Sequence, residues 1–308
     1  MRRLAARSAY MLVIVAVSSV AVFYAIRLSG GDAVAAVIQP GSASLEAREQ
    51  LRELWGLNLP IHEQYFDYMG RLLRGDLGNS LTNSSPISDM LIIHGRHSLI
   101  LGVAALLIVF GLGIPLGILA SLRRNGVVDA SIMTLSVGGM AIPNFWLALL
   151  VVWLFASTLH WLPSAGCCGP KQLVMPAFVL AAEGLALTVR MTRSAMLESL
   201  DRDFVRTLRS GGLSEVRVIG RHVLRNAMVP LVSLAGLRIG QIVGYALVVE
   251  TIFGWPGLGQ VLVNAVLRRD YPVAQFFSLV LVILVIMGNW AADLGYQFAN
   301  PRLRAARS

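Results

Sequence analysis

The sequence predicts an all-α integral membrane protein with six transmembrane helices. Hydrophobic residues make up 56% of the 308 residues and charged residues only 14%, which is too apolar a balance for an ordinary soluble domain. Apolar runs long enough to cross a hydrocarbon core of about 30 Å as a helix recur along the whole chain. Six such runs are expected, at 9–28, 98–121, 131–158, 173–194, 230–252 and 275–298.

The first run is predicted to be an uncleaved anchor. A basic start, an apolar stretch and the small residues Ala33-Val34-Ala35 are also typical of a signal peptide. The apolar stretch from Ala9 to Ile26 is long for a signal peptide, however. Residues 1–28 are therefore expected to form a cytoplasmic N-terminus and the first transmembrane helix.

Positive charge is distributed unevenly around the runs. The formal net charge is +9, and Lys171 is the only lysine. Every second segment between the runs lies on the same side of the membrane. Sixteen basic residues are in the segments of one side, whereas eight are in those of the other side. Because Arg and Lys are enriched in cytoplasmic loops, both termini are expected in the cytoplasm. The arginines are scattered over four membrane-flanking segments without a basic domain, which argues against nucleic-acid binding.

The segment 29–97 is predicted to form an extracytoplasmic helical cap. Ser44 is placed to cap a helix that ends at Gly56, and Pro60 begins an amphipathic helix that ends at Gly75. Ser85-Pro86 then supplies a cap followed by proline at the first helical position, where a helix toward the second run begins.

The segment 190–229 carries eight arginines and four acidic residues between two apolar runs. It is predicted to be a helical hairpin that turns at Gly211-Gly212, with one apolar stripe on each arm. The stripe residues are Leu197, Leu200, Phe204 and Leu208 on the first arm, and Leu213, Val216, Ile219 and Val223 on the second, which Ser214 would cap. Such a hairpin either rests on anionic lipid or docks a soluble partner.

Five stretches of sequence carry a family resemblance. They are RLSGGD at 27–32, WGLNLPIHEQYFDYMGRLLRGDLGNSL at 55–81, FWLALLVVWLF at 145–155, HWLPSAG at 160–166 and WPGLGQVLVNAVLRRDYPV at 255–273. They resemble the integral-membrane permeases of binding-protein-dependent ABC importers, specifically the dipeptide, oligopeptide and nickel group. In the first stretch, Ser29-Gly30 replaces the more usual alanine and proline.

The stretch from Arg206-Thr207-Leu208 through Gly212 to Pro230 is similar to the family's cytoplasmic signature loop. It departs from the general importer signature because the Glu-Ala-Ala positions differ and Gly212 lies eighteen residues before Pro230. The longer gap is typical of the peptide subgroup. The resemblance implies a coupling helix that docks on a separate ATPase. The residues it assigns to coupling are Phe204, Arg206, Thr207, Leu208, Arg209, Gly211, Gly212, Leu213 and Pro230.

Each part of this loop has an expected role. Phe204, Leu208 and Leu213 are expected to supply apolar burial, and Arg206 and Arg209 are expected to orient docking by charge. The glycine pair is expected to permit backbone angles that a side chain would oppose.

The resemblance also implies a type I ABC importer permease fold. The helical insertion 29–97 would lie between helices 1 and 2, followed by a transmembrane core at 98–298 and a cytoplasmic tail at 299–308. The chain would form half of a translocation pathway for di- or oligopeptides in the bacterial cytoplasmic membrane. Its implied partners are a second homologous permease, two ATP-binding domains, an extracytoplasmic substrate-binding protein and membrane lipid.

Two alternatives to peptide import remain open at this stage. One keeps the importer but exchanges the cargo for nickel or haem, and the other is a secondary transporter driven by an ion gradient. The halves of the chain show no internal repeat of the kind such transporters carry. ATP and Mg are expected on partner subunits, because no G-x-x-x-x-G-K-[ST] occurs in this sequence.

Ionisable residues inside the runs are candidates for function because they are costly there. They are Glu183, Arg238, Glu250 and Asp293. The candidate path residues are Arg238, Gln241, Tyr245 and Glu183, with a pairing of Arg238 and Glu183 as the structural alternative. Glu250 and Asp293 lie near helix ends, where water or another subunit would solvate them.

No catalytic or metal site is expected. Cys167 and Cys168 are adjacent, and two free thiols are favoured over a vicinal disulfide because neither metal nor redox spacing is present. His94 and His97 share a helix face but lack carboxylate neighbours in a metal pattern. Gly113 and Gly117 permit a close helix approach, either within the subunit or between subunits.

Overall fold

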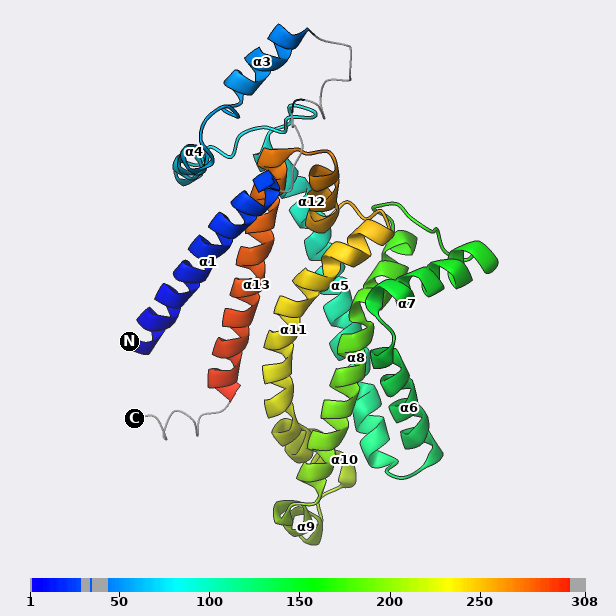
Figure 1. The fold of residues 1–308 in the computed structure, drawn as a ribbon. Helices are drawn as coiled ribbons and strands as arrows, with labels where there is room; N and C mark the ends of the chain where they lie inside the picture. Colours follow the sequence, from blue (N-terminus) through cyan, green and yellow to red (C-terminus); the bar gives the residue numbers. More distant parts are fainter. Residues whose placement is uncertain (1, 29–33, 35–43, 300–308) are drawn as a thin grey trace. The chain divides into compact units, whose positions relative to one another are not determined.

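The protein is described by a computed structural model that covers residues 2–28, 34 and 44–299 (Figure 1). Within those ranges the only strand pairing is an isolated bridge between Asn79 and Pro86. The helices are α1 (Arg2–Leu28), α3 (Leu45–Leu54), α4 (Ile61–Leu73), α5 (Ile87–Leu122), α6 (Val127–Ala141), α7 (Asn144–Val151), α8 (Pro170–Leu200), α9 (Asp203–Ser210), α10 (Glu215–Arg217), α11 (Leu224–Ile252), α12 (Leu258–Leu267) and α13 (Tyr271–Ala299), with π-helical η1 (Val152–Thr158) and η2 (Val218–Val223). The all-α prediction is confirmed.

Some predictions fall outside the described residues. Residues 33 and 35 of the small-residue triplet, most of the 27–32 stretch and the tail from residue 300 are not described. The side chain of Asp293 is not described either.

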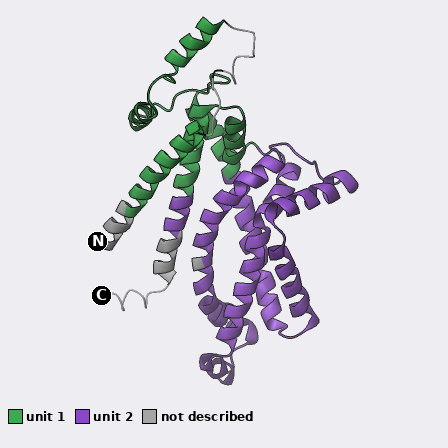
Figure 2. Cartoon of the chain, in the orientation of Figure 1, with its two compact units in different colours: residues 1–98, 256–284 green, residues 99–255, 285–308 purple. Residues whose placement is uncertain are grey.

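The chain forms two compact units, which Figure 2 shows in different colours. Unit 1 comprises residues 1–98 and 256–284, and unit 2 comprises residues 99–255 and 285–308. Helix α5 contributes its first residues to unit 1 and the remainder to unit 2.

The cap segment, residues 44–86 of unit 1, contains the short helices that the sequence predicts. Ser44 caps α3 by accepting a hydrogen bond from the Ala47 amide at 3.2 Å. Helix α4 follows Pro60, and Gly75 has a φ of +82°, a conformation that disfavours a side chain. Helix α5 begins at Ile87, one residue later than predicted, because Pro86 takes part in the isolated bridge.

Aromatic and polar contacts connect the segments of unit 1 that are distant in sequence. Tyr65 of α4 stacks edge-on against Phe23 of α1 with ring centroids 5.3 Å apart, and its hydroxyl lies 2.8 Å from Ser19. Asp270, which is 3% exposed, accepts hydrogen bonds from the Leu81 amide at 3.1 Å and the Thr82 hydroxyl at 3.0 Å. This buried carboxylate therefore fastens the cap segment to the turn between α12 and α13.

Unit 2 is built around α8, which packs against α6, α7 and α11. Glycines allow α5 to approach α8 closely. A Cβ on Gly113 would lie 2.8 Å from a Thr188 methyl carbon, and one on Gly117 would lie 2.5 Å from the Thr192 Cβ. The G-x-x-x-G pair thus serves packing within the subunit, as one of the two predicted alternatives.

The predicted third transmembrane run, 131–158, is not one straight helix. Helix α6 ends at Ala141, and α7 with η1 continues at an angle of 106° after a short break. The break precedes α7 at Ile142-Pro143, because a residue before proline is pushed out of the helical region and Ile142 has a ψ of 121°. Among the described residues, five helices are long and apolar enough to cross a membrane, and the bent pair makes up to six.

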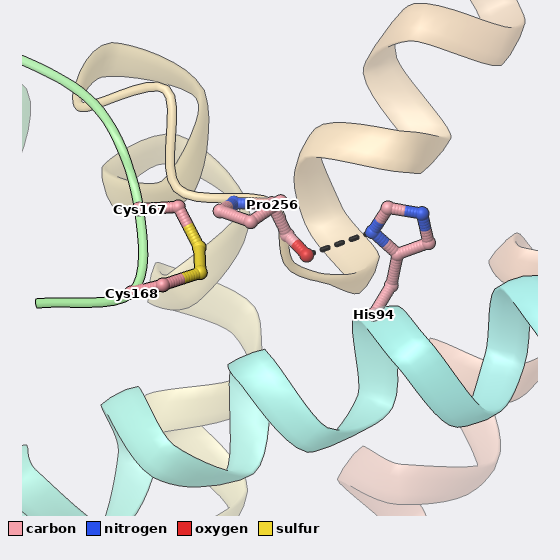
Figure 3. The surroundings of a disulfide bond; sticks show 4 residues. All are labelled: His94, Cys167, Cys168 and Pro256. Carbon is pink, nitrogen blue, oxygen red and sulfur yellow. Dashed lines mark hydrogen bonds between the residues drawn. A yellow bond between two sulfur atoms is a disulfide. The ribbon is translucent and has the colours of Figure 1, made fainter.

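The expectation of two free thiols is wrong, because Cys167 and Cys168 form a disulfide (Figure 3). Their Cα atoms are 3.7 Å apart, and Cys168 takes a φ of +80° in a tight loop. Elsewhere, His94 has a structural contact: its Nδ1 lies 2.7 Å from the Pro256 carbonyl oxygen within unit 1 (Figure 3).

Candidate functional site

The predicted hairpin at 190–229 is present, but it is divided into shorter helices. Helix α8 ends at Leu200, and α9 begins separately at Asp203, so the first arm is broken near Asp201. The second arm starts with the short α10 and continues through η2 into α11. The first arm is therefore two helices rather than one, and α9 is an eight-residue element of its own. Three residues of the predicted stripe, Leu200, Phe204 and Leu208, nevertheless pack against one apolar cluster.

Apolar side chains join the two arms in one cluster of unit 2. Its fully buried members are Met196, Val205, Val218, Val223 and Ala227, and its partly buried members include Phe204, Leu208 and Leu213. The three residues predicted to supply apolar burial thus lie at the edge of a core inside this chain. They are half-buried rather than fully exposed.

Two residues of the hairpin differ from the prediction. Val205 is 0% exposed although it is absent from the predicted stripe, whereas Val216 is 84% exposed although the stripe includes it. The burial of Val205 follows from the break at Asp201, because α9 starts a new helix whose faces are independent of those of α8. The second arm begins at Ser214 as predicted, but it becomes π-helical over Val218–Val223, where the 3.6-residue period of the predicted stripe does not hold. The 3-residue spacing of Val205 and Leu208 was the available signal.

The backbone conformation of the hairpin turn favours glycine at position 212 but not at position 211. Gly212 has a φ of +79°, where a side chain is strained, and it leaves open space within 4 Å of an added Cβ. Gly211 has an ordinary φ of −76°. An ion pair spans the turn, since Arg209 donates from Nε to Glu215 at 2.7 Å and from a terminal nitrogen at 3.1 Å.

The other candidate coupling residues occupy different positions. The side chain of Arg206 is 79% exposed, and its ion pair with Asp203 is long, with 3.9 Å between the guanidinium nitrogen and the carboxylate oxygen. Thr207 donates its hydroxyl to the Asp203 carbonyl at 3.2 Å, so it is bonded within α9. Pro230 lies inside α11, away from the turn, and lines a surface groove together with Arg190 and other residues of α8.

The predicted path residues come together between α8 and α11. Arg238 of α11, 3% exposed in its side chain, donates to Glu183 of α8 at 3.3 Å. Tyr245 of α11 lies near the same carboxylate. Among the described residues, neither Arg238 Nε nor Gln241 Oε1 has a hydrogen-bond partner, although both atoms are buried. The structural alternative, pairing of Arg238 with Glu183, is thus present, but it leaves hydrogen-bonding capacity unused.

Two buried charged groups were missed or misplaced. Asp129, 5% exposed in its side chain, forms a two-point ion pair with Arg193 at 2.6 and 2.7 Å. Its position in the first turn of α6 was the available signal. Glu250 is 0% exposed, so the expectation that water solvates it is wrong for this chain, and the adjacent Val249 is buried as well.

The sequence matches the family described as binding-protein-dependent transport system inner membrane component over residues 113–305, more than half of the chain. The chain belongs to that family. This transport permease is 37% identical to the di/tripeptide transport system permease protein DppB of Pseudomonas aeruginosa, over 92% of this chain and 93% of the relative. It is 35% identical to the oligopeptide transport system permease protein AppB of Bacillus subtilis, over 91% and 92%.

The fold of the permease is also similar to a solved structure, an inward-facing conformation of the MetNI methionine ABC transporter. The TM-score is 0.56, and the match covers 68% of this chain and 96% of that chain at 19% identity. This likeness confirms the predicted type I importer permease fold. The protein is therefore a multi-pass membrane permease subunit rather than an enzyme.

Proposed function

We propose that this permease forms half of the translocation pathway of an ATP-driven importer of di- or oligopeptides. The observation that carries the proposal is the similarity to peptide permeases at 35–37% identity over more than nine-tenths of each chain. A shared fold alone would not select a cargo, since one fold serves many functions. Similarity at this level over nearly the full length favours peptide over nickel or haem.

The hairpin supports a coupling role. One apolar cluster contains Val205 of α9, Met196 of α8 and Ala227 of α11. A rigid-body displacement of α9 would therefore be transmitted to α8 and α11 through packed side chains. The outer face of α9 carries Arg206, which is 79% exposed and forms only a long ion pair with Asp203, so it is accessible to a charged partner. The partners in this proposal are a second homologous permease, two ATP-binding domains that hold ATP and Mg, and an extracytoplasmic binding protein.

The orientation in the membrane belongs to the same proposal. The hairpin and both termini face the cytoplasm of a bacterium, and the cap segment faces outward. The distribution of arginines supports this orientation. It places the basic face of α9 where ATP is available.

The test is to tag the chain, express it at its native level, purify it in mild detergent and identify the chains that co-purify with it. ATP hydrolysis and uptake of a labelled dipeptide into vesicles are then measured. Recovery of an ATPase together with ATP-dependent uptake supports the proposal. Uptake that follows an ion gradient without ATP would establish a secondary transporter instead.

A charge reversal tests the coupling surface itself. Arg206→Glu should reduce ATPase recovery and dipeptide uptake without changing thermal stability, because the side chain is mostly exposed and weakly paired. Arg74→Glu in the cap segment makes the same charge change at another exposed site and serves as the control. Equal effects of the two variants would contradict a coupling role for α9.

A further inference from the structure

Unit 1 contains a cavity of about 290 Å³ whose wall combines the end of α1, helix α4, the loop before α5 and the first turn of α13. Small-molecule sites in proteins span roughly 300–1,000 Å³. The cavity is therefore of a size to hold a small ligand or part of a larger one. Neither the coupling hairpin nor the Arg238–Glu183 pair contributes to it.

Unsatisfied polar atoms are concentrated around this cavity. Among the described residues, four buried side-chain atoms of its lining have no hydrogen-bond partner: Arg27 Nε, Gln64 Oε1, Tyr68 Oη and Gln275 Nε2. Gln275 is 3% exposed. Buried polar groups are nearly always bonded, and leaving one unmet is costly, so four around one cavity require an explanation.

The surrounding contacts determine whether each of these atoms is available as a hydrogen-bond donor or as an acceptor. The amide nitrogen of Gln64 donates to the carbonyl oxygens of Leu57 and Leu59 at 3.2 and 2.7 Å, so its oxygen remains as an acceptor. Burial raises the pKa of Tyr68 to about 12, so its hydroxyl stays protonated at neutral pH and is able to donate.

Arg27 contributes a positive charge to the cavity wall. Its guanidinium lies 4.7 Å from the ring centroid of Tyr271 and 5.3 Å from that of Phe23. Within the described part of the chain it forms no ion pair. The neighbouring Arg71 differs, because Asp67 pairs with it at 2.8 Å. The cavity therefore presents the Arg27 cation, two further donors and one acceptor, and its lining also includes the carboxylates of Glu53 and Asp76.

We propose that this cavity binds the carboxyl-terminal end of a short peptide. A carboxylate would accept from the donors of Arg27, Tyr68 and Gln275, and the adjacent peptide N–H would donate to the Gln64 oxygen. Glu53 and Asp76 also line the cavity and suit the ammonium group of a short zwitterionic peptide. Inorganic phosphate would satisfy the donors but supplies no N–H for Gln64.

This inference rests on the proposed function only for the choice of peptide as cargo. It adds a ligand site in unit 1, to which neither α8 nor α11 contributes. Direct binding needs neither ATP nor a partner, so the site and the proposed function fail independently of each other.

The experiment is calorimetric titration of the full-length chain in lipid nanodiscs with the dipeptide Ala-Ala. Ala-Ala amide, which lacks the carboxylate, and inorganic phosphate are titrated in parallel. Saturable binding of Ala-Ala is expected, at least about tenfold tighter than binding of the amide or of phosphate. Equal binding of all three, binding of phosphate alone, or no binding of Ala-Ala would overturn the proposal.

Matched variants locate the site. Tyr68→Phe and Gln275→Leu should each weaken Ala-Ala binding by at least about tenfold. Tyr65→Phe removes a hydroxyl on the same helix that is bonded to Ser19, and Gln260→Leu changes a glutamine that does not line the cavity. Both controls should bind Ala-Ala like the unchanged chain. Equal weakening by a variant and its control would place any binding elsewhere.

The melting temperature without peptide separates a ligand site from a structural one. Gln275→Leu removes a buried amide nitrogen that has no hydrogen-bond partner, so it should not lower the melting temperature of the ligand-free chain. A fall of several degrees would show that the amide stabilises the fold and would overturn its assignment to a ligand. Tyr68→Phe keeps the binding test valid if Gln275→Leu fails to fold.

Discussion

Helix α8 forms two ion pairs that differ in how completely the arginine is satisfied. Arg193 meets Asp129 of α6 with two nitrogens at 2.6 and 2.7 Å, although its side chain is still 23% exposed. Arg238 of α11 meets Glu183 with one nitrogen at 3.3 Å, although its own side chain is only 3% exposed. The more deeply buried arginine is thus the less satisfied one.

The difference distinguishes a structural pair from a candidate binding group. A guanidinium that meets a carboxylate at two points is oriented and has little to offer a further ligand. A buried guanidinium with an unmet Nε retains a donor and a charge for a group that is absent from this chain. We interpret the Arg193 pair as a joint between α6 and α8, and the Arg238 pair as a place where the pathway can contact its cargo.

The strongest test breaks the satisfied pair. Arg193→Ala should lower the free energy of unfolding by about 3–5 kcal/mol, because it leaves the buried Asp129 carboxylate unpaired. Unfolding in detergent, followed by far-UV circular dichroism, measures this loss. The double variant Asp129→Leu/Arg193→Met removes both charges and should recover most of it. A loss below about 1 kcal/mol in the single variant would contradict a structural role.

A second test moves the backbone that carries the same pair. Gly117 of α5 lies against Thr192, next to Arg193, and an added Cβ would come within 2.7 Å of the Val189 carbonyl oxygen. Gly117→Ala should therefore cost about 1–3 kcal/mol of stability through overpacking. Gly111→Ala on the same helix meets nothing within 4 Å and should be neutral or stabilising, since alanine favours helix. Similar losses in both variants would contradict a close crossing.

These contacts show how far the sequence could predict the fold. Hydropathy alone identified the membrane runs, and the caps at Ser44 and Pro60 gave the short helices, because both signals are local. The bend at Pro143 also has a local cause, but the hydropathy stays high on both sides of it, so the apolar run 131–158 does not reveal the bend. The pairing of Asp129 with Arg193 joins residues 64 apart in sequence, and no local pattern encodes it.

The candidate site was predictable to a similar degree. The two adjacent glycines predict the turn at Gly212, and the Arg238–Glu183 pair is one of the alternatives that the sequence predicts. The burial of Val205 depends on where α9 begins, and the faces of the second arm depend on the π-helical stretch Val218–Val223. Such boundaries are set by tertiary packing in this hairpin, so helical periodicity assigned its faces incorrectly.

A third test breaks the incompletely satisfied pair. Arg238→Met should change the free energy of unfolding by less than about 1 kcal/mol, because Glu183 is 28% exposed and water replaces its partner. Dipeptide uptake should fall about tenfold, which corresponds to about 1.4 kcal/mol. Vesicle uptake and unfolding are measured on the same preparation. A large loss of stability with unchanged uptake would reverse the distinction and make Arg238 the structural arginine.

The smallest expected effect compares two adjacent glycines in the hairpin that follows α8. Gly212→Ala should cost about 1 kcal/mol or slightly more, because a φ of +79° strains any residue with a Cβ. Gly211→Ala should stay within about 0.5 kcal/mol, since its φ of −76° suits alanine. Chemical unfolding of both variants measures the difference. Equal costs would mean that the turn does not depend on the left-handed conformation of Gly212, and that the Arg209–Glu215 ion pair holds the two arms together without it.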